Sequence, residues 1–366
     1  MKYRIIIFFL LCYFSCDTVT KKSKISSDHN CMPSNTITKN LSKDSNDIEF
    51  ALSGNTKGMI YVEGGEFEMG GDNNEAKQDE FPKHQVVVNS FWMDETEVTN
   101  DQFKEFVDAT GYITTAEKAI DWNEIKKIVP PGTPKPHDSL LAPASLIFYE
   151  TEVTNLNDFT QWWRLEKNTN WRSPYGKDSN IKNKGNHPVI HISWDDAIAY
   201  CKWAGKRLPT EAEFEYASRG GLKNNLYSWG NEPINQGKLK ANTWEGKFPS
   251  NNKMKDKFYY TAPVKSFDPN GFGFYDLGGN VWEWCSDWYH SDYYNMSSKK
   301  IAVNPKGPKN SYDPMEPYSP KKVMRGGSFL CNDSYCSGFR NSMRMKSTPD
   351  SSSMHTGFRT VMDVKS

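Results

Sequence analysis

The sequence lacks an excess of charge of either sign. Its 366 residues carry 45 Lys and Arg and 45 Asp and Glu, so it does not predict the basic surface that nucleic-acid binding requires. It also lacks a fixed-period repeat, which disfavours solenoids and propellers. There is no G-x-S-x-G motif, and Gly326-Gly327-Ser328 lacks the strand–elbow–helix setting of a serine hydrolase. Glycine-rich phosphate-binding loops are absent as well.

Cysteine is scarce, and its placement matters more than its number. Of seven cysteines, Cys12 and Cys16 belong to an apolar N-terminal segment and Cys31 lies in a polar stretch. The folded part therefore holds four, Cys201, Cys285, Cys331 and Cys336, too few to staple a domain of this size. We expect Cys201 to be a small buried apolar residue on the inner face of a helix.

The N-terminus has the pattern of a targeting segment. Lys2 and Arg4 precede an apolar run, residues 5–14, that is too short to span a bilayer. The run ends at Ser15-Cys16, which resembles the lipobox of bacterial lipoproteins, in which the cysteine carries the lipid; Tyr13 stands where Leu is usual. The alternative is an ordinary cleaved signal peptide. Either interpretation predicts export, and the first predicts a lipid-anchored protein of the periplasm or outer membrane of a Gram-negative bacterium.

Composition divides the rest of the chain into two parts. Residues 17–56 are rich in Ser, Lys, Asn and Asp, so we expect a flexible tether. Residues 57–364 contain most of the 12 Trp, 18 Tyr and 20 Phe, and the 25 Gly and 20 Pro of the chain indicate many turns. No later run of about 20 apolar residues occurs, so no transmembrane domain is predicted. We expect one continuous, loop-rich α+β domain.

Several local elements are predicted within that domain. Alternating residues around a Gly-Gly turn predict a hairpin in 59–70, and 84–100 is typical of a second strand pair. Asn100 is expected to cap a helix that ends at Gly111. Further helices are expected after Ser193 and after Thr210, which forms a capping box with Glu213. Residues 113–185 give few periodic cues.

His187 and His191 are candidate metal ligands. A four-residue spacing, as in His187 and His191, suits chelation on a helix, but Pro188 and the β-branched residues that follow favour a strand. There, residues four apart lie roughly 13 Å from each other. We therefore expect both histidines to be structural.

Two groups of oxygen-bearing residues suit calcium, which prefers carboxylate, amide and backbone oxygens in irregular loops. One group is Asn242 and Thr243 with Asp256 and Phe258; the other is Asp276, Gly279, Val281 and Glu283. Spacing alone leaves open an ordinary solvated or N-capping acidic loop.

The pair Cys331 and Cys336 is the strongest chemical signal. The four residues between them are polar and turn-forming, so a turn can bring the two sulfurs together. Three interpretations remain open from the residues alone: a structural disulfide, a soft two-thiolate site for redox chemistry or Cu(I), and two unrelated thiols. Three arginines in the same region, Arg325, Arg340 and Arg344, are expected to lower the thiol pKa.

The sequence resembles the formylglycine-generating enzymes, or sulfatase-modifying factors, from Met59 to Val361. The matching blocks are GGEFEMG, FWMDETEVTNDQFKEFV, HPVIHISWDDAIAYCKWAGKRLPTEAEFEYASRGG, WGNE, ANTWEGKFP, APVKSFDPNGFGFYDLGGNVWEWCSDWY and KVMRGGSFLCNDSYCSGFR with STPDSSSMHTGFR. The last block but one is the most specific, because both active-site cysteines of the family are matched with their spacing. The resemblance implies a loop-rich fold of the formylglycine-generating enzyme and C-type-lectin-like type.

The resemblance also implies an activity. Members oxidise a cysteine in a C-x-P-x-R motif of an unfolded sulfatase to Cα-formylglycine, using O2 and Cu(I) held between two cysteines. By match, Cys331 and Cys336 would bind copper, with the substrate thiol as a third ligand. Whether the metal-free pair rests as a disulfide or as thiols stays open from the sequence. Ser328 would orient oxygen or substrate, and Trp282 would line the pocket.

The same resemblance assigns structural calcium ligands and marks departures. The first ion would be bound by Asn242, the Thr243 carbonyl, Asp256 and the Phe258 carbonyl, and the second by Asp276, the Gly279 and Val281 carbonyls and Glu283. Three of four cysteine positions that form further disulfides in animal members are replaced, by Ala217, Asn341 and Thr360. His355 stands where some members have Asn, and residues 118–165 are longer than in the family.

Two competing functions were weighed against the oxidase. A non-catalytic lipoprotein of the same fold, serving a secretion machinery, would not require the cysteine pair. An iron- and histidine-dependent oxygenase of the superfamily is disfavoured because no two histidines have chelating geometry and no helical domain precedes the fold. The expected partners are therefore unfolded sulfatases and O2, with a membrane contact through the lipid anchor alone and no nucleic acid.

Overall fold

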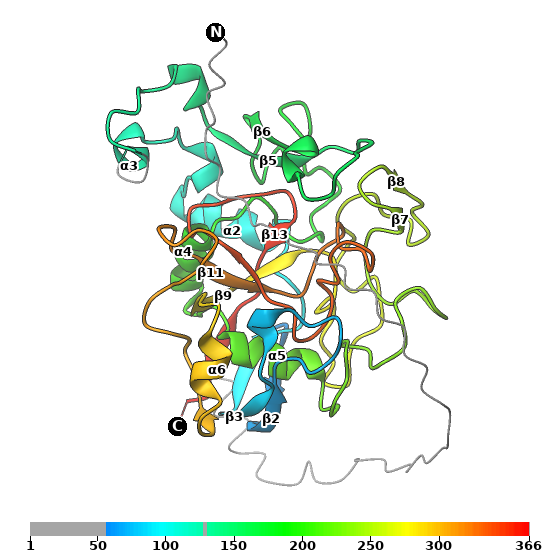
Figure 1. The fold of residues 1–366 in the computed structure, drawn as a ribbon. Coiled ribbons are helices and arrows are strands. Elements are labelled where there is room, and N and C mark those ends of the chain that lie inside the picture. The colour runs from blue at the N-terminus through cyan, green and yellow to red at the C-terminus, as the bar shows by residue number, and fades with distance from the viewer. Residues whose placement is uncertain (1–55, 127–129, 366) are drawn as a thin grey trace.

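The computed structural model describes residues 56–126 and 130–365 (Figure 1). The predicted signal, 1–16, and nearly all of the predicted tether, 17–56, lie outside this part of the chain. The described residues form a mixed α/β, loop-rich fold, as expected, with short strands and few helices. None of the helices among them is long and apolar enough to cross a membrane.

A four-stranded sheet carries the segments on which the candidate site is built. Its strands are β9 (Trp282–Trp288), β11 (Lys322–Arg325), β12 (Met345–Ser347) and β13 (Thr356–Gly357), in the order β12-β11-β9-β13. β11 pairs antiparallel with both neighbours, and β13 lies parallel to β9. The register of β11 against β9 shifts between Lys322 and Met324.

Two three-stranded sheets are formed by the N-terminal strands. One has the order β1-β4-β14 and the other β10-β3-β2; the strands are β1 (Met59–Val62), β2 (Gly65–Met69), β3 (His84–Val88), β4 (Phe91–Asp94), β10 (Ala302–Val303) and β14 (Val361–Asp363). The predicted hairpin is therefore wrong, because β1 and β2 belong to different sheets, and β3 and β4 likewise do not pair with each other.

The reason lies in two turns that pack together. A Cβ atom on Gly64 would lie 2.6 Å from backbone atoms of Asn89 and Ser90, and the Gly64 N–H donates to the Ser90 hydroxyl at 2.9 Å. The Gly-Gly turn connects β1 to β2 and the turn after β3 connects β3 to β4, so each leads from one sheet to the other. The two turns pack directly against each other, and only glycine at position 64 allows their backbones to approach so closely.

Two small sheets and several short helices fill the loop regions. The sheets pair β5 (Ala144–Phe148) with β6 (Trp163–Lys167), and β7 (Gly246–Lys247) with β8 (Asn251–Asn252). The helices are η1 (Gln78–Glu80), η2 (Thr115–Glu117), α3 (Trp122–Ile125), η3 (Asp138–Leu140), η4 (Phe159–Gln161) and α6 (Tyr293–Ser297). The region 113–185, which the sequence left unassigned, therefore contributes β5 and β6.

The three longer helices begin at side-chain caps, as predicted, with one correction. They are α2 (Asn100–Thr110), α4 (Trp194–Ala204) and α5 (Glu211–Arg219). Ser193 caps α4, and Thr210 with Glu213 forms the capping box of α5. The cap of α2 is Thr99 rather than Asn100, because the Thr99 side chain accepts from the N–H of Gln102 while the Asn100 amide donates to the Lys184 carbonyl.

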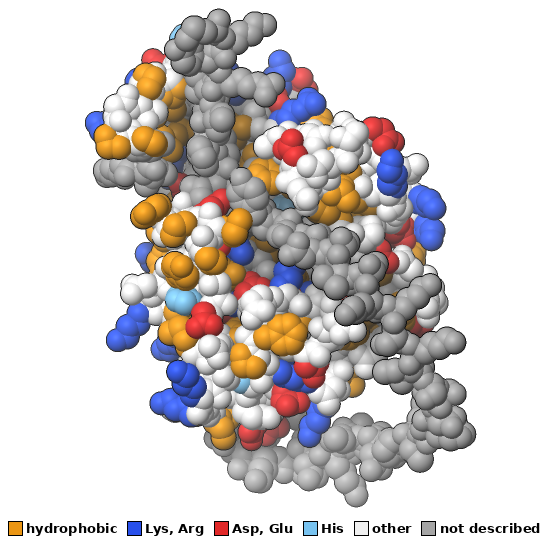
Figure 2. Space-filling view, in the orientation of Figure 1, with side chains coloured by type: hydrophobic (Ala, Val, Ile, Leu, Met, Phe, Trp, Pro, Cys, Tyr) orange, Lys and Arg blue, Asp and Glu red, His pale blue; other side chains and the backbone are white. Residues whose placement is uncertain are grey.

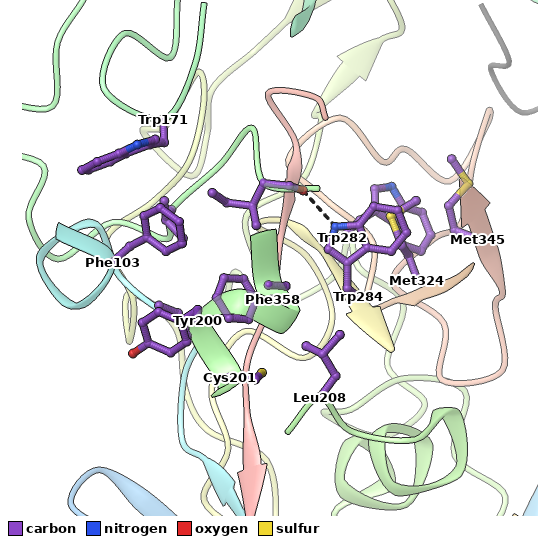
Figure 3. Close-up of a cluster of buried hydrophobic side chains, with 14 of the residues drawn as sticks. Phe103, Trp171, Tyr200, Cys201, Leu208, Trp282, Trp284, Met324, Met345 and Phe358 are labelled. Carbon is purple, nitrogen blue, oxygen red and sulfur yellow. Dashed lines mark hydrogen bonds between the residues drawn. The ribbon is translucent and has the colours of Figure 1, made fainter. Parts of the chain in front are cut away.

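The largest core cluster joins α2 and α4 to the central sheet. Phe103 packs against Trp171, Tyr200 and Phe358 with ring centroids 5.3 to 6.4 Å apart. Trp284 donates its indole N–H to the Ile192 carbonyl at 2.9 Å, the bond drawn in Figure 3. Cys201 is buried in the same cluster, which confirms its expected role as a small apolar residue.

Charged side chains of both signs are interspersed over the surface. Figure 2 shows acidic and basic residues side by side on the coloured parts of the face in view. This agrees with the balanced composition of the chain.

A buried ion network ties the segment that carries the cysteine pair to α5. Arg325 donates to Glu211 at 2.8 Å and to Glu215 at 2.6 Å, and Arg344 donates to both oxygens of Glu211. Arg219 completes the set through Glu215 at 2.6 Å. The side chains of this network are 0 to 7% exposed. Nearly every oxygen and guanidinium group has a partner, which is the condition under which buried charge is tolerated.

Removing Arg325 is expected to unfold the protein much more easily than removing an exposed charge. Arg325→Ala should lower the free energy of unfolding by about 3–5 kcal/mol, because it leaves carboxylate charge buried without compensation. Lys238→Ala, which breaks the exposed pair of Lys238 and Asp268, should cost about 0–1 kcal/mol. Urea denaturation followed by tryptophan fluorescence measures both; equal losses would contradict the proposed role of the network.

Candidate active site

The cysteine pair lies in a loop that begins directly after β11. Gly326 and Gly327 have positive φ values of 95° and 80°, and a Cβ atom on Gly327 would lie 2.7 Å from backbone atoms of Gly338 and Phe339. The loop can therefore fold back on itself only with glycine at this point. Asn332 fixes its far side by donating to the carbonyls of Trp244 and Gly246 at 3.0 and 3.1 Å.

The turn brings the two sulfurs to 3.3 Å from each other as separate thiols. Burial raises the pKa of Cys331 well above its usual value. The pKa of Cys336 is lowered, first by the hydrogen bond from the Cys331 thiol and then by the positive charges of Lys77 and Arg340. Of the two, Cys336 is therefore the cysteine whose thiolate form is favoured, with the Cys331 thiol as its hydrogen-bond donor.

Both thiols face a small cavity with mainly aromatic walls. Its volume is about 80 Å³, and its lining includes Trp162, Trp163, Phe248, Trp282, Ser328 and His355. Trp282, Trp284, Met324 and Met345, which lie close together in Figure 3, form the side made by the central sheet. The structure therefore places the predicted residues Cys331, Cys336, Ser328 and Trp282 around one space.

Ser328 connects Cys331 with His355. The Ser328 N–H points to the Cys331 sulfur at 3.3 Å, and the Ser328 hydroxyl lies 3.9 Å from that sulfur and 3.4 Å from His355 Nδ1. Burial lowers the pKa of His355 to about 3, so its imidazole is neutral. The ring of His355 packs edge-on against Trp163, with centroids 4.8 Å apart.

Of the three arginines expected to lower the thiol pKa, only Arg340 is found to do so. Arg325 and Arg344 are bound by the carboxylates of α5 and act as anchors of the loop. Arg340 pairs with Glu80 at 2.6 Å and still lowers the pKa of Cys336. Lys77, which the sequence analysis did not single out, contributes more than Arg340 does. No motif marks Lys77, because it reaches Cys336 only through the tertiary fold.

The first predicted calcium group contains two buried oxygens without a partner. Asn242 Oδ1 and Asp256 Oδ2 are both buried and accept no hydrogen bond in the structure. Desolvation raises the pKa of Asp256 to about 6. Two unpartnered buried oxygens are costly, and a cation bound by them would remove that cost. The donor set therefore fits calcium.

The second predicted group also gathers negative charge. Glu283 is buried and Asp276 half-buried, and desolvation raises the pKa of both, that of Asp276 to about 6. Arg359 occupies both oxygens of Glu283, at 2.7 and 2.8 Å. A third carboxylate, Glu97, was missed by the sequence analysis; its Oε2 is buried without a hydrogen bond, and desolvation with the charges of Asp276 and Glu283 raises its pKa. Three carboxylates thus surround one guanidinium.

Within residues 56–126 and 130–365, no three or more His, Cys, Asp or Glu side chains converge as a metal-binding group. The hypotheses made from the sequence rely on other donors: two thiols for copper, and amide and backbone oxygens beside the carboxylates for calcium.

The two histidines of HPVIH have separate partners, in agreement with a structural role. His187 Nδ1 contacts the Thr261 hydroxyl at 3.0 Å, whereas His191 contacts Ser145 at 2.8 Å and the Pro174 carbonyl at 2.7 Å. The predicted strand is not formed: Pro188 makes a single bridge to Thr99, and His191 has a φ of 60°.

Comparisons with known proteins identify the family of the chain. Residues 45–364 match the family described as "Sulfatase-modifying factor enzyme 1-like domain". The chain is 43% identical to the formylglycine-generating enzyme of Mus musculus over 306 residues, covering 83% of this chain and 75% of that protein. It is 42% identical to that of Thermomonospora curvata over 310 residues, covering 84% and 94%.

One relative is named inactive, so similarity to the family does not by itself establish catalysis. A Bos taurus protein named "Inactive C-alpha-formylglycine-generating enzyme 2" is 36% identical over 310 residues, covering 84% of this chain and 88% of that protein. Among solved structures, "Structure of PvdO from Pseudomonas aeruginosa" matches with a TM-score of 0.53 at 22% identity, covering 83% of this chain and 93% of that one. That likeness supports the fold.

The buried His191 is expected to make stability fall in acid. Burial lowers its pKa to about 4, below the value of 6.5 for an unperturbed histidine. The neutral form therefore stabilises the fold above pH 6.5, and this contribution is lost as the pH falls toward 4. His191→Asn, whose side chain tolerates positive φ, should remove this dependence. Between pH 7.5 and pH 5 the wild type should lose about 2 kcal/mol relative to the variant in urea titrations; a constant difference would contradict the assignment.

Proposed function

The chain belongs to the formylglycine-generating enzyme (sulfatase-modifying factor) family, and from this membership we propose that it oxidises a cysteine of sulfatases to Cα-formylglycine. The supporting observation is that Cys331 and Cys336 lie 3.3 Å apart, as free thiols, at the same aromatic cavity. A non-catalytic member of the fold would not need this arrangement. The substrate would be an unfolded sulfatase segment containing C-x-P-x-R, and O2 the oxidant.

Two adjacent soft sulfur donors suit a copper ion in its Cu(I) state. Cys331 and Cys336 would hold it, the substrate thiol would bind beside them, and the bound ion would supply the redox chemistry with O2. Cys336 is already favoured as the thiolate, whereas Cys331 must lose its proton when it binds metal. The Ser328 N–H fixes the Cys331 sulfur, and the Ser328 hydroxyl shares a hydrogen bond with the neutral His355.

The walls of the cavity contribute by excluding water. Trp282 is 1% exposed and lines the same space as Trp163 and Phe248. A cysteine side chain that enters this space leaves bulk water and meets the thiols in a fixed position, and such positioning is a large part of catalysis. The predicted signal at residues 1–16 would place the reaction outside the cytoplasm, with a lipid on Cys16.

Calcium is proposed as a structural ion. Asn242 and Asp256, with the carbonyls of Thr243 and Phe258, would hold one ion. Asp276 and Glu283, with the carbonyls of Gly279 and Val281, would hold another. The two unpartnered oxygens of the first group support this assignment most strongly.

Loss of either active-site thiol is expected to abolish turnover. With Cu(I) and a peptide that contains C-x-P-x-R, the wild-type protein should convert the CH2–SH group of the cysteine to CHO, measured as the corresponding fall in peptide mass. Cys331→Ala and Cys336→Ala should give no product, and Ser328→Ala should slow the reaction about a hundredfold through lost positioning. Cys201→Ala, which removes a buried cysteine elsewhere in the core, is the matched control and should remain active. The proposal is wrong if the copper-loaded Cys331→Ala and Cys336→Ala proteins behave like the wild type.

Calcium stoichiometry separates the two predicted groups. After dialysis against calcium, elemental analysis should find two ions bound to the wild type and one each in Asp256→Ala and Asp276→Ala. Asp268→Ala changes an exposed carboxylate in the same region and should retain both ions. Bound calcium should also stabilise the protein, by about 2.7 kcal/mol at a hundred times the dissociation constant. If neither Asp256→Ala nor Asp276→Ala lowers the number of bound calcium ions, the assignment of the two groups is wrong.

A further inference from the structure

The two cysteines of the pair do not have the same surroundings. Among the described residues, Cys331 borders the aromatic cavity, whereas Cys336 borders both that cavity and a second, larger space on its other side. Tyr335 and Met345 lie along the same boundary and line both spaces. Cys336 therefore stands in the wall between them.

The second space is a cleft that, unlike the cavity, has charged side chains in its lining, and it is called the polar cleft below. Its volume is about 1060 Å³, and its lining includes Asn74, Lys77, Asp79, Asp313, Asp333, Ser337, Arg340 and Lys346. The cavity, at about 80 Å³, has Trp162, Trp163, Trp282 and Trp284 in its walls instead. A hydrophilic molecule thus finds solvated partners in the cleft, whereas an apolar or partly apolar group is better matched to the cavity.

Cys331 does not line the cleft. A Cβ atom on Gly338 would lie 2.5 Å from the Cys331 sulfur and 2.6 Å from the Trp282 ring, so the Gly338 backbone packs closely against this sulfur. On the cleft side, Lys77 and Arg340 are near enough to Cys336 for their charges to act on its sulfur. Access from the polar side therefore leads to Cys336.

We propose that the cleft is the entry route of a small hydrophilic thiol that reduces the Cys331–Cys336 disulfide at Cys336. The proposal rests on the proposed function, because copper binding requires the pair in its reduced form and the O2 used by the reaction also oxidises adjacent thiols. The separation of 3.3 Å needs only a small movement to reach the bond length of about 2 Å.

The exchange is balanced without any further reactant. A thiolate from the cleft attacks the Cys336 sulfur, the bond between the two cysteines breaks, and Cys331 leaves with the electron pair and takes a proton. A second thiol attacks the mixed disulfide on Cys336, which leaves as the thiol, and the small disulfide is released. Two electrons pass from two thiols to the protein. If leaving-group stability alone decided, the thiol would attack Cys331 and Cys336 would leave. The cleft gives access to Cys336 instead, so access decides which sulfur is attacked.

The arrangement separates two reactants that are both thiols. The sulfatase cysteine would enter through the aromatic cavity and the reductant through the polar cleft. The reducing thiol and the sulfatase cysteine can therefore each reach the cysteine pair without displacing the other.

Two matched Ser→Trp variants test the route. Ser337 lines the cleft and Ser351 lines the cavity, and both are half-buried. The full-length protein is oxidised to the disulfide form without metal, and reduced glutathione is then added. Ser337→Trp should slow the reduction about tenfold or more by blocking access, whereas Ser351→Trp should leave the rate within about twofold of the wild type. Asn74→Trp, an exposed cleft residue, provides a second obstruction if Ser337→Trp does not fold.

A trapped intermediate gives an independent readout. Samples quenched early with an alkylating reagent should carry glutathione on Cys336 in peptide maps. Glutathione on Cys331, or equal slowing by Ser337→Trp and Ser351→Trp, would overturn the proposal. If the asymmetry is found but the C-x-P-x-R peptide is not oxidised, the proposed function fails and the route stands. If the peptide is oxidised but Ser337→Trp and Ser351→Trp slow the reduction equally, the proposed function stands and the proposed route is wrong.

Discussion

The buried pairing of arginines with the carboxylates of α5 is the interaction on which the candidate site depends. Arg325 and Arg344 flank the loop that carries both cysteines, and both are bound to Glu211, with Glu215 as a second partner of Arg325. Arg340, between them, is bound to Glu80. The loop also buries Phe329, Leu330, Phe339 and Met343 in the core clusters, so the ion pairs and these apolar side chains together hold it in place.

The fixed loop produces an unequal thiol pair. Cys331 is enclosed by Trp282, Gly338 and the Ser328 backbone, whereas Cys336 faces Lys77 and Arg340 across the cleft. Burial raises the pKa of Cys331, whereas the hydrogen bond from the Cys331 thiol, followed by the charges of Lys77 and Arg340, lowers the pKa of Cys336, 3.3 Å away. Such a pair can share one proton when empty and offer two thiolates to a soft metal ion.

Much of the molecule is organised to support this small region. The paired turns at Gly64 and Ser90 divide the N-terminal strands between two sheets, and β9 and β11 deliver Trp282 and the glycine turn to the cavity. Asp256 and Asp276 lie in loops, whereas Glu283, beside Asp276, lies in β9. The raised pKa values of Asp256 and Asp276 follow from the desolvation of their carboxylates.

The sequence by itself determined the features that depend on neighbouring residues: the caps at Ser193 and Thr210, the apolar position of Cys201, the turn between Cys331 and Cys336, and the family. Only the tertiary structure decided which strands pair, where the arginines point, and that Lys77 and Glu97 act at these sites. Those contacts join residues that lie far apart in the chain, Arg325 and Glu215 being 110 positions apart. Periodicity and spacing carry no information about them, because they arise only when separate elements pack together.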